Sequence, residues 1–519
     1  MTVQALVKPS EYHDSVSLML VARELAGLEG VQDAAVVMAT EANKSILAGA
    51  GLLTPELEGA GPNDLVLAVS AQDETKAAQA LAKAQELLKR KAAADTGNES
   101  RPKSIRGALS LHPGANLAVI SVAGRYAVEE AWEALEHGLH VLLFSDNVSL
   151  EDEIALKKFG REHGLLLMGP GAGTAILNGV ALGFANVLPA GPVGIVSAAG
   201  TGLQEVSSLL ARAGVGISQG IGTGGRDLKK EVGGIMMLLA LQALQQDPAT
   251  SVLVLISKPP AVEVAQMVLK QVSASSKPTV ICFLGGEMDA MAKPSNVLPA
   301  RTLQECSLLA ARAVISETND FQVTLAEENA RLMEQAAHLK QKLEVRQRYL
   351  RGLFSGGTLC YEAQVIWQDM LVTPVHSNAP LPGGLSLTDS TRSFGHTAVD
   401  LGEEEFTVGR PHPMIDNDLR IRRLLQEARD PETAAIMLDI VLGYGAHPDP
   451  AGELGPAIRQ ARALAGEAGR DLPVVASVTG TPGDPQGLEH TVDCLREAGA
   501  SVCDSNAAAA RLTGMIVSA

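Results

Sequence analysis

The chain has 519 residues, a formal net charge of −17 at pH 7 and only 3% aromatic residues. An acidic chain repels phosphate backbones, which argues against nucleic-acid binding, and no apolar run of about 18 residues predicts a membrane span. The five cysteines are scattered and none has metal-ligand spacing, so we expect free thiols, a cytoplasmic location and no bound metal. At roughly 100–200 residues per domain, the length predicts three or four domains.

Residues 1–95 predict a small N-terminal α/β module. The segments VQDAAVVMAT and DLVLAVSAQ are typical of strands, and the Ala/Lys/Glu-rich stretch that follows them is typical of a helix. With the helical pattern of SVSLMLVARELAGLEG before them, these segments suggest a βαβ-like order. Polar residues 95–104 are predicted to form a linker.

Residues 105–190 alternate between strand and helix patterns of the length that predicts a parallel sheet and a Rossmann-like domain. Ligands favour the carboxyl ends of such strands, which makes Ser121, Gly124 and Arg125, after the strand NLAVISVA, candidates for cofactor binding. No GxGxxG follows a strand here, so a plain α/β domain without a cofactor is the alternative.

The two following units read as copies of one another. Residues 191–320 and 352–519 flank a helical connector at 321–351 and carry three matches in the same order. The matches are GIVSAAGT with GLFSGGT, DPATSVLVLIS with DPETAAIMLDI, and KPTVICFLGGE with LPVVASVTGTP. We expect the two copies to pair about a pseudo-two-fold axis, with insertions in the second.

Each copy carries a strand–turn–helix element that predicts an anion site. A helix N-terminus has free N–H groups and about half a positive charge, so two converging N-termini would hold a phosphate, phosphoryl or carboxylate group. The candidate residues are Ser197, Gly200, Thr201 and Gly202 in the first copy, and Ser355, Gly356, Gly357 and Thr358 in the second. The alternative is that both are packing turns with Ser/Thr caps.

These motifs resemble a known family. GPVGIVSAAGTGLQEV and AGVGISQGIGTGGRDL resemble the ligase domain of the succinyl-CoA synthetase α-subunit, and GLFSGGTLCYEA resembles the CoA-ligase domain of the β-subunit. Taken in order, the motifs resemble the FdrA family of predicted acyl-CoA synthetases over essentially the whole chain. The resemblance implies a multidomain α/β fold with a Rossmann-like CoA-binding-type domain and two flavodoxin-like ligase domains. It also implies that the glycine-rich turn GIGTGG, with Gly222 and Gly224, lines the site between the two helices.

The sequence departs from the synthetases in two ways. Their phosphohistidine loop corresponds to FLGGEMDAMAKPSNVLPARTLQEC, which has no histidine and whose nearest charged candidate is Glu287. The ATP-grasp domain of the β-subunit is also missing. Both departures argue against ATP and Mg²⁺ chemistry through phosphohistidine in this chain alone, and leave CoA and a phosphate-bearing ligand as candidate cofactors.

The insertion of the second copy, FGHTAVDLGEEEFTVGRPHPMID, is polar and contains Gly and Pro. Long loops of this kind are usually functional or disordered. We predict that His396, Arg410 and His412 contact substrate and contribute to catalysis, although a surface or structural histidine is the alternative for each one.

The resemblance implies a subunit that handles acyl or carbamoyl transfer from a phosphate or CoA derivative. It points to oxamate carbamoyl transfer in purine and allantoin breakdown, with partner subunits or as a homo-oligomer. The alternative is a non-catalytic or regulatory subunit that binds CoA or acyl-CoA while a partner performs the chemistry.

Overall fold

The computed structural model describes residues 2–9, 11, 18, 21–22, 24–25, 27–40, 43–44, 47–48, 50–62, 64–94, 102–122, 124–286, 294–315, 321–407 and 411–518, except for the side chains of residues 90–94, 125 and 321. The chain forms two compact units. The smaller unit contains Met1–Ser104 and Glu404–His412, and the larger unit contains Ile105–Glu403 and Pro413–Ala519.

The smaller unit is built on an antiparallel sheet in the order β1-β3-β2. Its elements are β1 (Thr2–Lys8), β2 (Val31–Met38), α3 (Pro55–Glu58), β3 (Leu65–Ala71), α4 (Glu74–Ala94) and α14 (Glu404–Thr407). The side chains of β3 alternate, so that Leu67 packs in the core that includes α4 and Val66 packs on the other face with Leu57. The α/β module is confirmed, but the βαβ-like order is wrong because both strand pairs are antiparallel.

The larger unit begins with a parallel sheet in the order β4-β5-β6. Its elements are α5 (Ile105–Leu111), β4 (Leu117–Ile120), α6 (Gly124–Glu136), β5 (His140–Leu143), α7 (Leu150–His163) and β6 (Leu167–Met168). The helices α6 and α7 cover one face of this sheet through the apolar cluster that contains Ala127, Ala131 and Leu156. The alternation predicted for this region is confirmed.

A seven-stranded sheet follows in the order β13-β12-β11-β9-β10-β7-β8. Its elements are β7 (Thr174–Leu177), β8 (Val180–Gly183), β9 (Ala190–Ser197), α8 (Gly200–Arg212), β10 (Ile217–Gly222), α9 (Ile235–Gln246), β11 (Val252–Ser257), α10 (Val262–Val272), β12 (Thr279–Phe283), β13 (Val297–Pro299) and α11 (Leu303–Ile315). The hairpin β7–β8, which precedes the boundary predicted at residue 190, pairs with β10 of this sheet.

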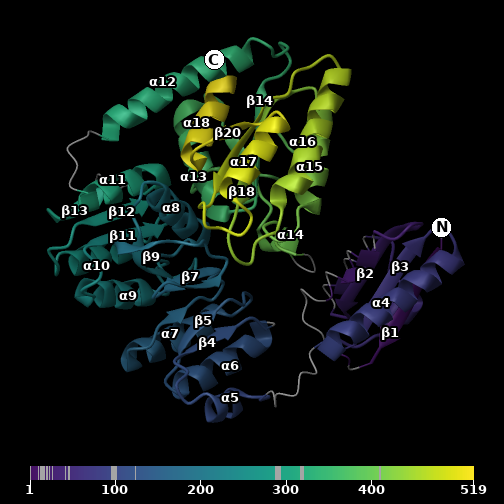
Figure 1. The fold of residues 1–519 in the computed structure, drawn as a ribbon, viewed down its shortest axis with the longest axis horizontal. Coiled ribbons are helices and arrows are strands. Elements are labelled where there is room, and N and C mark those ends of the chain that lie inside the picture. Colours follow the sequence, from purple (N-terminus) through teal and green to yellow (C-terminus); the bar gives the residue numbers. More distant parts are fainter. Residues whose placement is uncertain are drawn as a thin grey trace. The chain divides into compact units, whose positions relative to one another are not determined.

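A second seven-stranded sheet has the order β16-β15-β17-β14-β18-β19-β20. Its elements are β14 (Tyr349–Phe354), α13 (Gly357–Met370), β15 (Val375–Ser377), β16 (Leu385–Ser386), β17 (His396–Asp400), α15 (Asp418–Arg429), β18 (Thr433–Val441), α16 (Pro450–Glu467), β19 (Val474–Thr479), α17 (Leu488–Glu497), β20 (Ser501–Cys503) and α18 (Asn506–Val517). The predicted duplication is confirmed, because β14, β18, β19 and β20 repeat the arrangement of β9, β11, β12 and β13. Figure 1 shows the two large sheets side by side.

The two copies share one apolar core. A single cluster of buried side chains contains Leu203 of α8 and Val254 of β11 together with Leu359 of α13 and Ala508 of α18. The connector α12 (Phe321–Lys340) packs along α18. Among the described residues, no helix combines the length and the low charge that a membrane-crossing segment requires.

Candidate functional site

The N-termini of α8 and α13 meet at the interface between the two copies. The helices begin at Gly200 and Gly357, each after the strand that the sequence indicated. The backbone N–H of Thr358 donates a hydrogen bond to Thr201 Oγ1 at 3.3 Å, and a Cβ on Gly202 would lie 3.0 Å from the Thr358 methyl group. The prediction that the two turns lie close together is confirmed, and we call this region the two-helix site.

A carboxylate of the chain already caps the second helix. Asp439 accepts hydrogen bonds from the backbone N–H groups of Ser355 and Gly356 at 2.7 and 2.8 Å, and from the Ser355 hydroxyl at 3.0 Å. Arg420 also donates to Asp439. Asp439 thus already occupies the N–H groups of Ser355 and Gly356, and binding of an external anion by these two residues stays a prediction.

The first helix is free of such a cap. Ser197 Oγ accepts the Ala199 N–H at 3.0 Å and donates to the Ala199 carbonyl, so Ser197 shapes the turn and is buried. The N-cap residue Ala199 offers no side-chain cap to α8. Gly200, Thr201 and Gly357 are half-buried, which leaves the opening of the site at the first turn of each helix.

A second buried carboxyl lies at the start of α13. Asp400 ends β17, the neighbour of β14, and a Cβ on Gly357 would lie 2.5 Å from Asp400 Oδ2. Oδ1 of Asp400 accepts the Gly402 N–H at 2.9 Å, while Asn378 exchanges two hydrogen bonds with the Asp400 backbone. Burial raises the pKa of Asp400 to about 7, and Lys258 partly offsets this.

Lys258 supplies the positive charge of the two-helix site. It follows β11 in the first copy, and its ammonium lies 5.4 Å from the centre of the Tyr361 ring on α13. Within the described part of the chain it forms no ion pair, although it is close enough to Asp400 and Cys360 to influence the pKa of each. Sequence reasoning missed Lys258 and Asp439 and noted Asp400 only as a polar neighbour of His396 and His412, although each lies at or near the carboxyl end of a buried strand.

Packing explains the glycine-rich turn after β10. A Cβ on Gly222 would lie 2.3 Å from the Thr174 carbonyl oxygen, and Gly224 has φ +88° beside Gly169 and Pro170. Fully buried Lys157 of α7 donates to the Thr223 carbonyl at 3.0 Å and pairs with Asp227 and Glu153 at 2.8 Å. Asp227 accepts two backbone N–H groups at the start of α9. Gly222 and Gly224 are thus held by backbone contacts, and anion binding by either stays a prediction.

Of the three residues predicted to be catalytic, only His396 is placed relative to the two-helix site by the described part of the chain. His396 begins β17, so the length of the strand, about 13 Å for four residues, separates it from Asp400 and the two-helix site. Its ring is buried and Nδ1 accepts the Leu350 N–H at 3.2 Å. His412 belongs to the smaller unit, and Arg410, like Glu287, lies outside the described residues.

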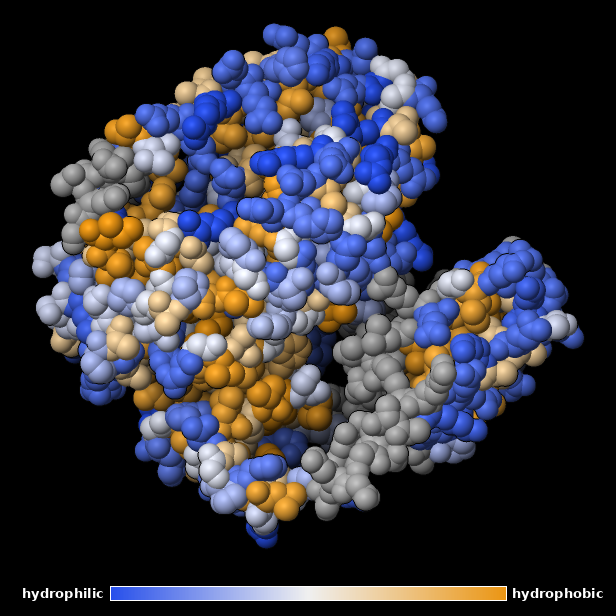
Figure 2. Space-filling model, viewed as in Figure 1, coloured by the Kyte–Doolittle hydropathy of each residue, from blue (hydrophilic) through white to orange (hydrophobic). Residues whose placement is uncertain are grey.

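The three residues predicted to bind a cofactor surround the start of α6. Ser121 is exposed, and Gly124 opens the helix with no space for a Cβ, which would lie 2.3 Å from the Asp146 carbonyl oxygen. The side chain of Arg125 lies outside the described residues. Val119, Val122 and Tyr126 are exposed nearby, and Figure 2 shows apolar surface gathered over β4 and α6.

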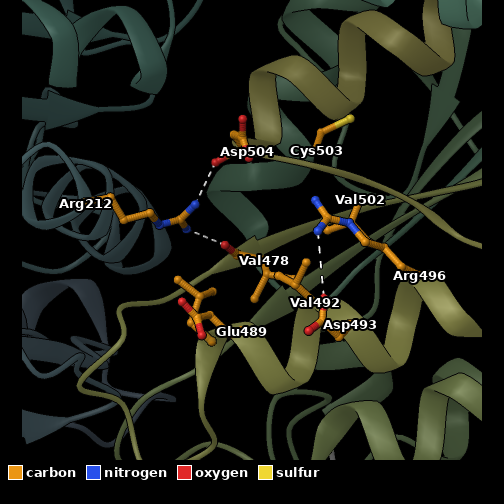
Figure 3. Close-up of a pocket in the computed structure, with 10 residues that line it drawn as sticks. Arg212, Val478, Glu489, Val492, Asp493, Arg496, Val502, Cys503 and Asp504 are labelled. Atoms are coloured by element: carbon orange, nitrogen blue, oxygen red, sulfur yellow. Dashed lines mark hydrogen bonds and ion pairs between the residues drawn. The ribbon is translucent and has the colours of Figure 1, made fainter.

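A separate pocket of about 330 Å³ lies at the carboxyl ends of β19 and β20. Arg212 crosses to it from the end of α8 and donates to the carbonyls of Val478, Gly480 and Asp504. Figure 3 shows this arginine facing α17, where Asp493 and Arg496 form a pair at 3.9 Å. Arg212 thus spends three of its five guanidinium N–H donors on backbone carbonyls of the second copy, where it acts as a clamp between the copies.

Three family matches follow the domains in order. Residues 1–104 match the family described as "AllF, heavy metal-associated domain", residues 190–285 match "CoA binding domain", and residues 353–516 match "CoA-ligase". Among the described residues, no three His, Cys, Asp or Glu side chains are arranged to hold a metal ion. The CoA-binding match covers β9 to β12, so cofactor binding by residues 105–190 stays a prediction.

Curated relatives extend the likeness. The chain is 44% identical to the uncharacterized protein YahF of Escherichia coli K12 over 507 residues, which cover 98% of this chain and 97% of YahF. It is 29% identical to the α-subunit of the ADP-forming succinate–CoA ligase of Methanothermobacter thermautotrophicus over 33% of this chain and 57% of that subunit. A solved structure of the dinucleotide-forming acetyl-coenzyme A synthetase 1 of Ca. Korarchaeum cryptofilum aligns over 77% of this chain and 82% of its own, with 16% identity and a TM-score of 0.28.

The family matches show that the duplicated sheets are CoA-binding and CoA-ligase domains similar to those of acyl-CoA synthetases and succinyl-CoA ligases. The full-length likeness to YahF shows that the chain belongs to the FdrA family.

Proposed function

We propose that this chain is an acyl-CoA-synthetase-like subunit that binds the phosphoryl or carboxyl group of a small acyl or carbamoyl derivative in the two-helix site. The observation that carries the proposal is the hydrogen bond between Thr358 and Thr201, which joins the two helix N-termini beside Lys258. N–H groups at a helix N-terminus and an ammonium group together suit a phosphate or carboxylate.

The site would act chiefly through electrostatics. Negative charge that develops on a transferring phosphoryl or acyl group would be stabilised by the first N–H groups of α8 and by the Lys258 ammonium. The Thr201 hydroxyl already accepts the Thr358 N–H and so keeps its proton available for a ligand oxygen. These groups come from the first copy, and the hydrogen bond from the Thr358 N–H of the second copy would fix the position of the Thr201 hydroxyl before a ligand arrives.

CoA is the proposed second ligand. The CoA-binding and CoA-ligase matches support it, and the exposed apolar side chains near Ser121, Gly124 and Arg125 offer a surface for a pantetheine arm. Carbamoyl phosphate, in an oxamate carbamoyl transfer of purine or allantoin breakdown, is the finer proposal that the FdrA resemblance suggests. Partner subunits or a second copy of the chain would complete the assembly.

Ligand titration tests the site. The wild-type protein should bind acetyl phosphate and carbamoyl phosphate in calorimetry, and Lys258→Gln should weaken binding about tenfold or more because a charge-assisted contact is lost. Lys270→Gln, an exposed lysine on α10, is the matched control and should bind like wild type. Equal affinity in wild type and Lys258→Gln would reject the proposal.

A non-catalytic or regulatory role is the second candidate. It is favoured by the absence of histidine between Leu284 and Ala311, where the synthetases carry their phosphohistidine. The discriminating measurement is turnover of carbamoyl phosphate or acyl-CoA by the purified chain. Binding without turnover, followed by turnover when partner subunits are added, would favour this second role.

A further inference from the structure

Asp400 holds an unusual place in the two-helix site. Its side chain is only 2% exposed, and its backbone is fixed by the reciprocal pair with Asn378. Oδ1 is satisfied by the Gly402 N–H, whereas among the described residues no hydrogen bond is donated to Oδ2, which lies against Gly357 at the opening of α13. A buried carboxyl oxygen therefore lies beside the position where a ligand would meet the helix.

The charges around Asp400 come from several elements. Lys258 after β11 attracts the carboxylate, while Asp439 of β18, Glu403 after β17 and the Cys360 thiol of α13 are the other titratable groups that face it. Asp439 accepts hydrogen bonds from two backbone N–H groups and forms an ion pair with Arg420. The cluster thus contains one carboxyl group with several partners, one ammonium group and the Asp400 carboxyl, whose Oδ2 has no hydrogen-bond donor among the described residues.

The duplication makes this carboxyl distinctive. The strand that corresponds to β17 in the first copy is β10, and its carboxyl-terminal half reads GIG, without an ionisable residue. In β18 the matching segment MLDI carries Asp439, whereas VLVLIS of β11 carries no charge before Lys258. The first copy therefore contributes the cation and the second copy contributes the acids, which is an asymmetry that packing alone does not require.

An anion that enters the site changes the balance at Asp400. A bound sulfate or phosphoryl group next to Oδ2 would repel a carboxylate but would accept a hydrogen bond from a protonated carboxyl. We propose that Asp400 is a specificity-determining residue of the two-helix site that takes up a proton when the anion binds and donates that proton in a hydrogen bond to a ligand oxygen. This inference rests on the proposed anion site and adds to it the protonation state of the partner group.

The raised pKa of Asp400, about 7, agrees with this role because little free energy is needed to protonate the carboxyl near neutral pH. The site would then prefer fully ionised oxyanions that lack a donor of their own, since Oδ2 provides the donor. Neutral amides and alcohols would gain less from the same arrangement.

Sulfate is the appropriate probe because it does not titrate between pH 6 and about pH 9. Calorimetric titration of the wild-type chain should give a dissociation constant that rises about tenfold per pH unit above pH 7, because binding then requires proton uptake. Titrations at pH 7.5 in two buffers of different ionisation enthalpy should show uptake of a fraction of a proton for each sulfate bound.

Two variants separate Asp400 from other acids. Asp400→Asn keeps an acceptor for the Gly402 N–H and offers an amide donor at every pH, so its sulfate affinity should be constant between pH 6 and 9 and should exceed wild type at pH 9. Glu362→Gln replaces another buried acid, whose pKa is also raised to about 7, and should keep the wild-type pH dependence.

The outcomes are distinguishable. Sulfate binding that is independent of pH in wild type, with no proton uptake, would overturn the role of Asp400 and leave the anion site standing. A pH dependence that survives in Asp400→Asn would also overturn it. Failure of wild type to bind sulfate or phosphate at any of these pH values would overturn the proposed site itself, and the inference with it.

Discussion

Glu205 and Glu362 occupy the same position in α8 and α13, and each carboxylate crosses to the other copy. Glu205 accepts the backbone N–H of Asn506 at the start of α18 at 2.9 Å, and Glu362 accepts that of Leu303 at the start of α11 at 2.6 Å. The Asn506 side chain then donates to Glu362 at 2.7 Å. The two copies therefore cap each other's last helices, and this exchange fixes the angle at which α8 and α13 meet.

Glu362 should make the protein less stable as the pH rises. Burial raises its pKa from 4.5 to about 7, so between these values the folded chain holds a proton that the unfolded chain releases. The contribution of Glu362 to the free energy of unfolding should therefore fall by about 3 kcal/mol across this window, and Asp400 contributes a fall of the same sign. Because His396 contributes the opposite sign over part of this range, the contribution of Glu362 is measured as the difference between wild type and a Glu362 variant in urea denaturation at pH 5, 6 and 7.

Glu362→Gln should flatten this fall without abolishing it, because Asp400 remains. The variant should be less stable than wild type at pH 5. Its side-chain NH₂ group would face the NH₂ group of Asn506, so two hydrogen-bond donors would lie opposite each other. Exposed Glu334→Gln on α12 is the control and should follow wild type. A Glu362→Gln profile parallel to that of wild type would show that Glu362 is ionised throughout.

The glycines that open the two helices should respond differently to alanine. A Cβ on Gly357 would lie 2.5 Å from Asp400 Oδ2, whereas a Cβ on Gly200 would lie 3.6 Å from the Thr174 hydroxyl, which is an ordinary contact. Gly357→Ala should cost about 1–3 kcal/mol and weaken anion binding, and Gly200→Ala should stay within about 1 kcal/mol of wild type. Thermal unfolding and sulfate titration of both variants check this, and equal losses would contradict it.

The sequence predicted the fold well because its signals are local. Buried strands such as VLVLIS and the repeated strand–turn–helix elements show in the residue pattern, and the order of matches indicated the duplication. The antiparallel order of the smaller unit was missed because β1 pairs with β3, far along the chain, and nothing local specifies that partner. The pairing of the hairpin β7–β8 with β10 was not foreseen for the same reason.

Only part of the candidate site could be predicted from the sequence. The glycines of the two turns are visible in the sequence, but the charges that complete the site lie on other strands. Lys258, Asp400 and Asp439 gather there only because parallel strands end at one edge of a sheet and the two sheets meet. The prediction for His396 relied on its place in the polar insertion that also contains Asp400. His396 lies four residues before Asp400, which places it at the opposite end of β17.

Lys157 should be essential for the stability of the larger unit. Its ammonium is fully buried between Glu153 and Asp227, and it holds the Thr223 carbonyl of the glycine-rich turn. Lys157→Met would leave the buried Asp227 carboxylate without its cation, while Glu153 keeps its ion pair with Arg226 at 2.7 Å, and should cost about 3–5 kcal/mol in urea denaturation. Lys158→Met, exposed on the same helix, should cost little. Similar stabilities of the two variants would show that the buried cluster is not a net requirement.

His396 should govern acid stability rather than ligand binding. Burial and the neighbouring Arg351 lower the pKa of His396 from 6.5 to about 4, so in this window the unfolded chain binds a proton that the folded chain does not. The contribution of His396 to stability should therefore be lost as the pH falls from about 6.5 to 4, opposite in sign to the contributions of Glu362 and Asp400, so it is measured as the difference between wild type and a His396 variant. His396→Gln can still accept the Leu350 N–H but cannot ionise, so its stability should fall less over this range. Exposed His338→Gln is the control for the loss of an imidazole.

Sulfate affinity at pH 7 should match wild type in both variants, because β17 separates His396 from the two-helix site. Loss of affinity in a folded His396→Gln variant would instead return this histidine to the binding site that its sequence context indicated.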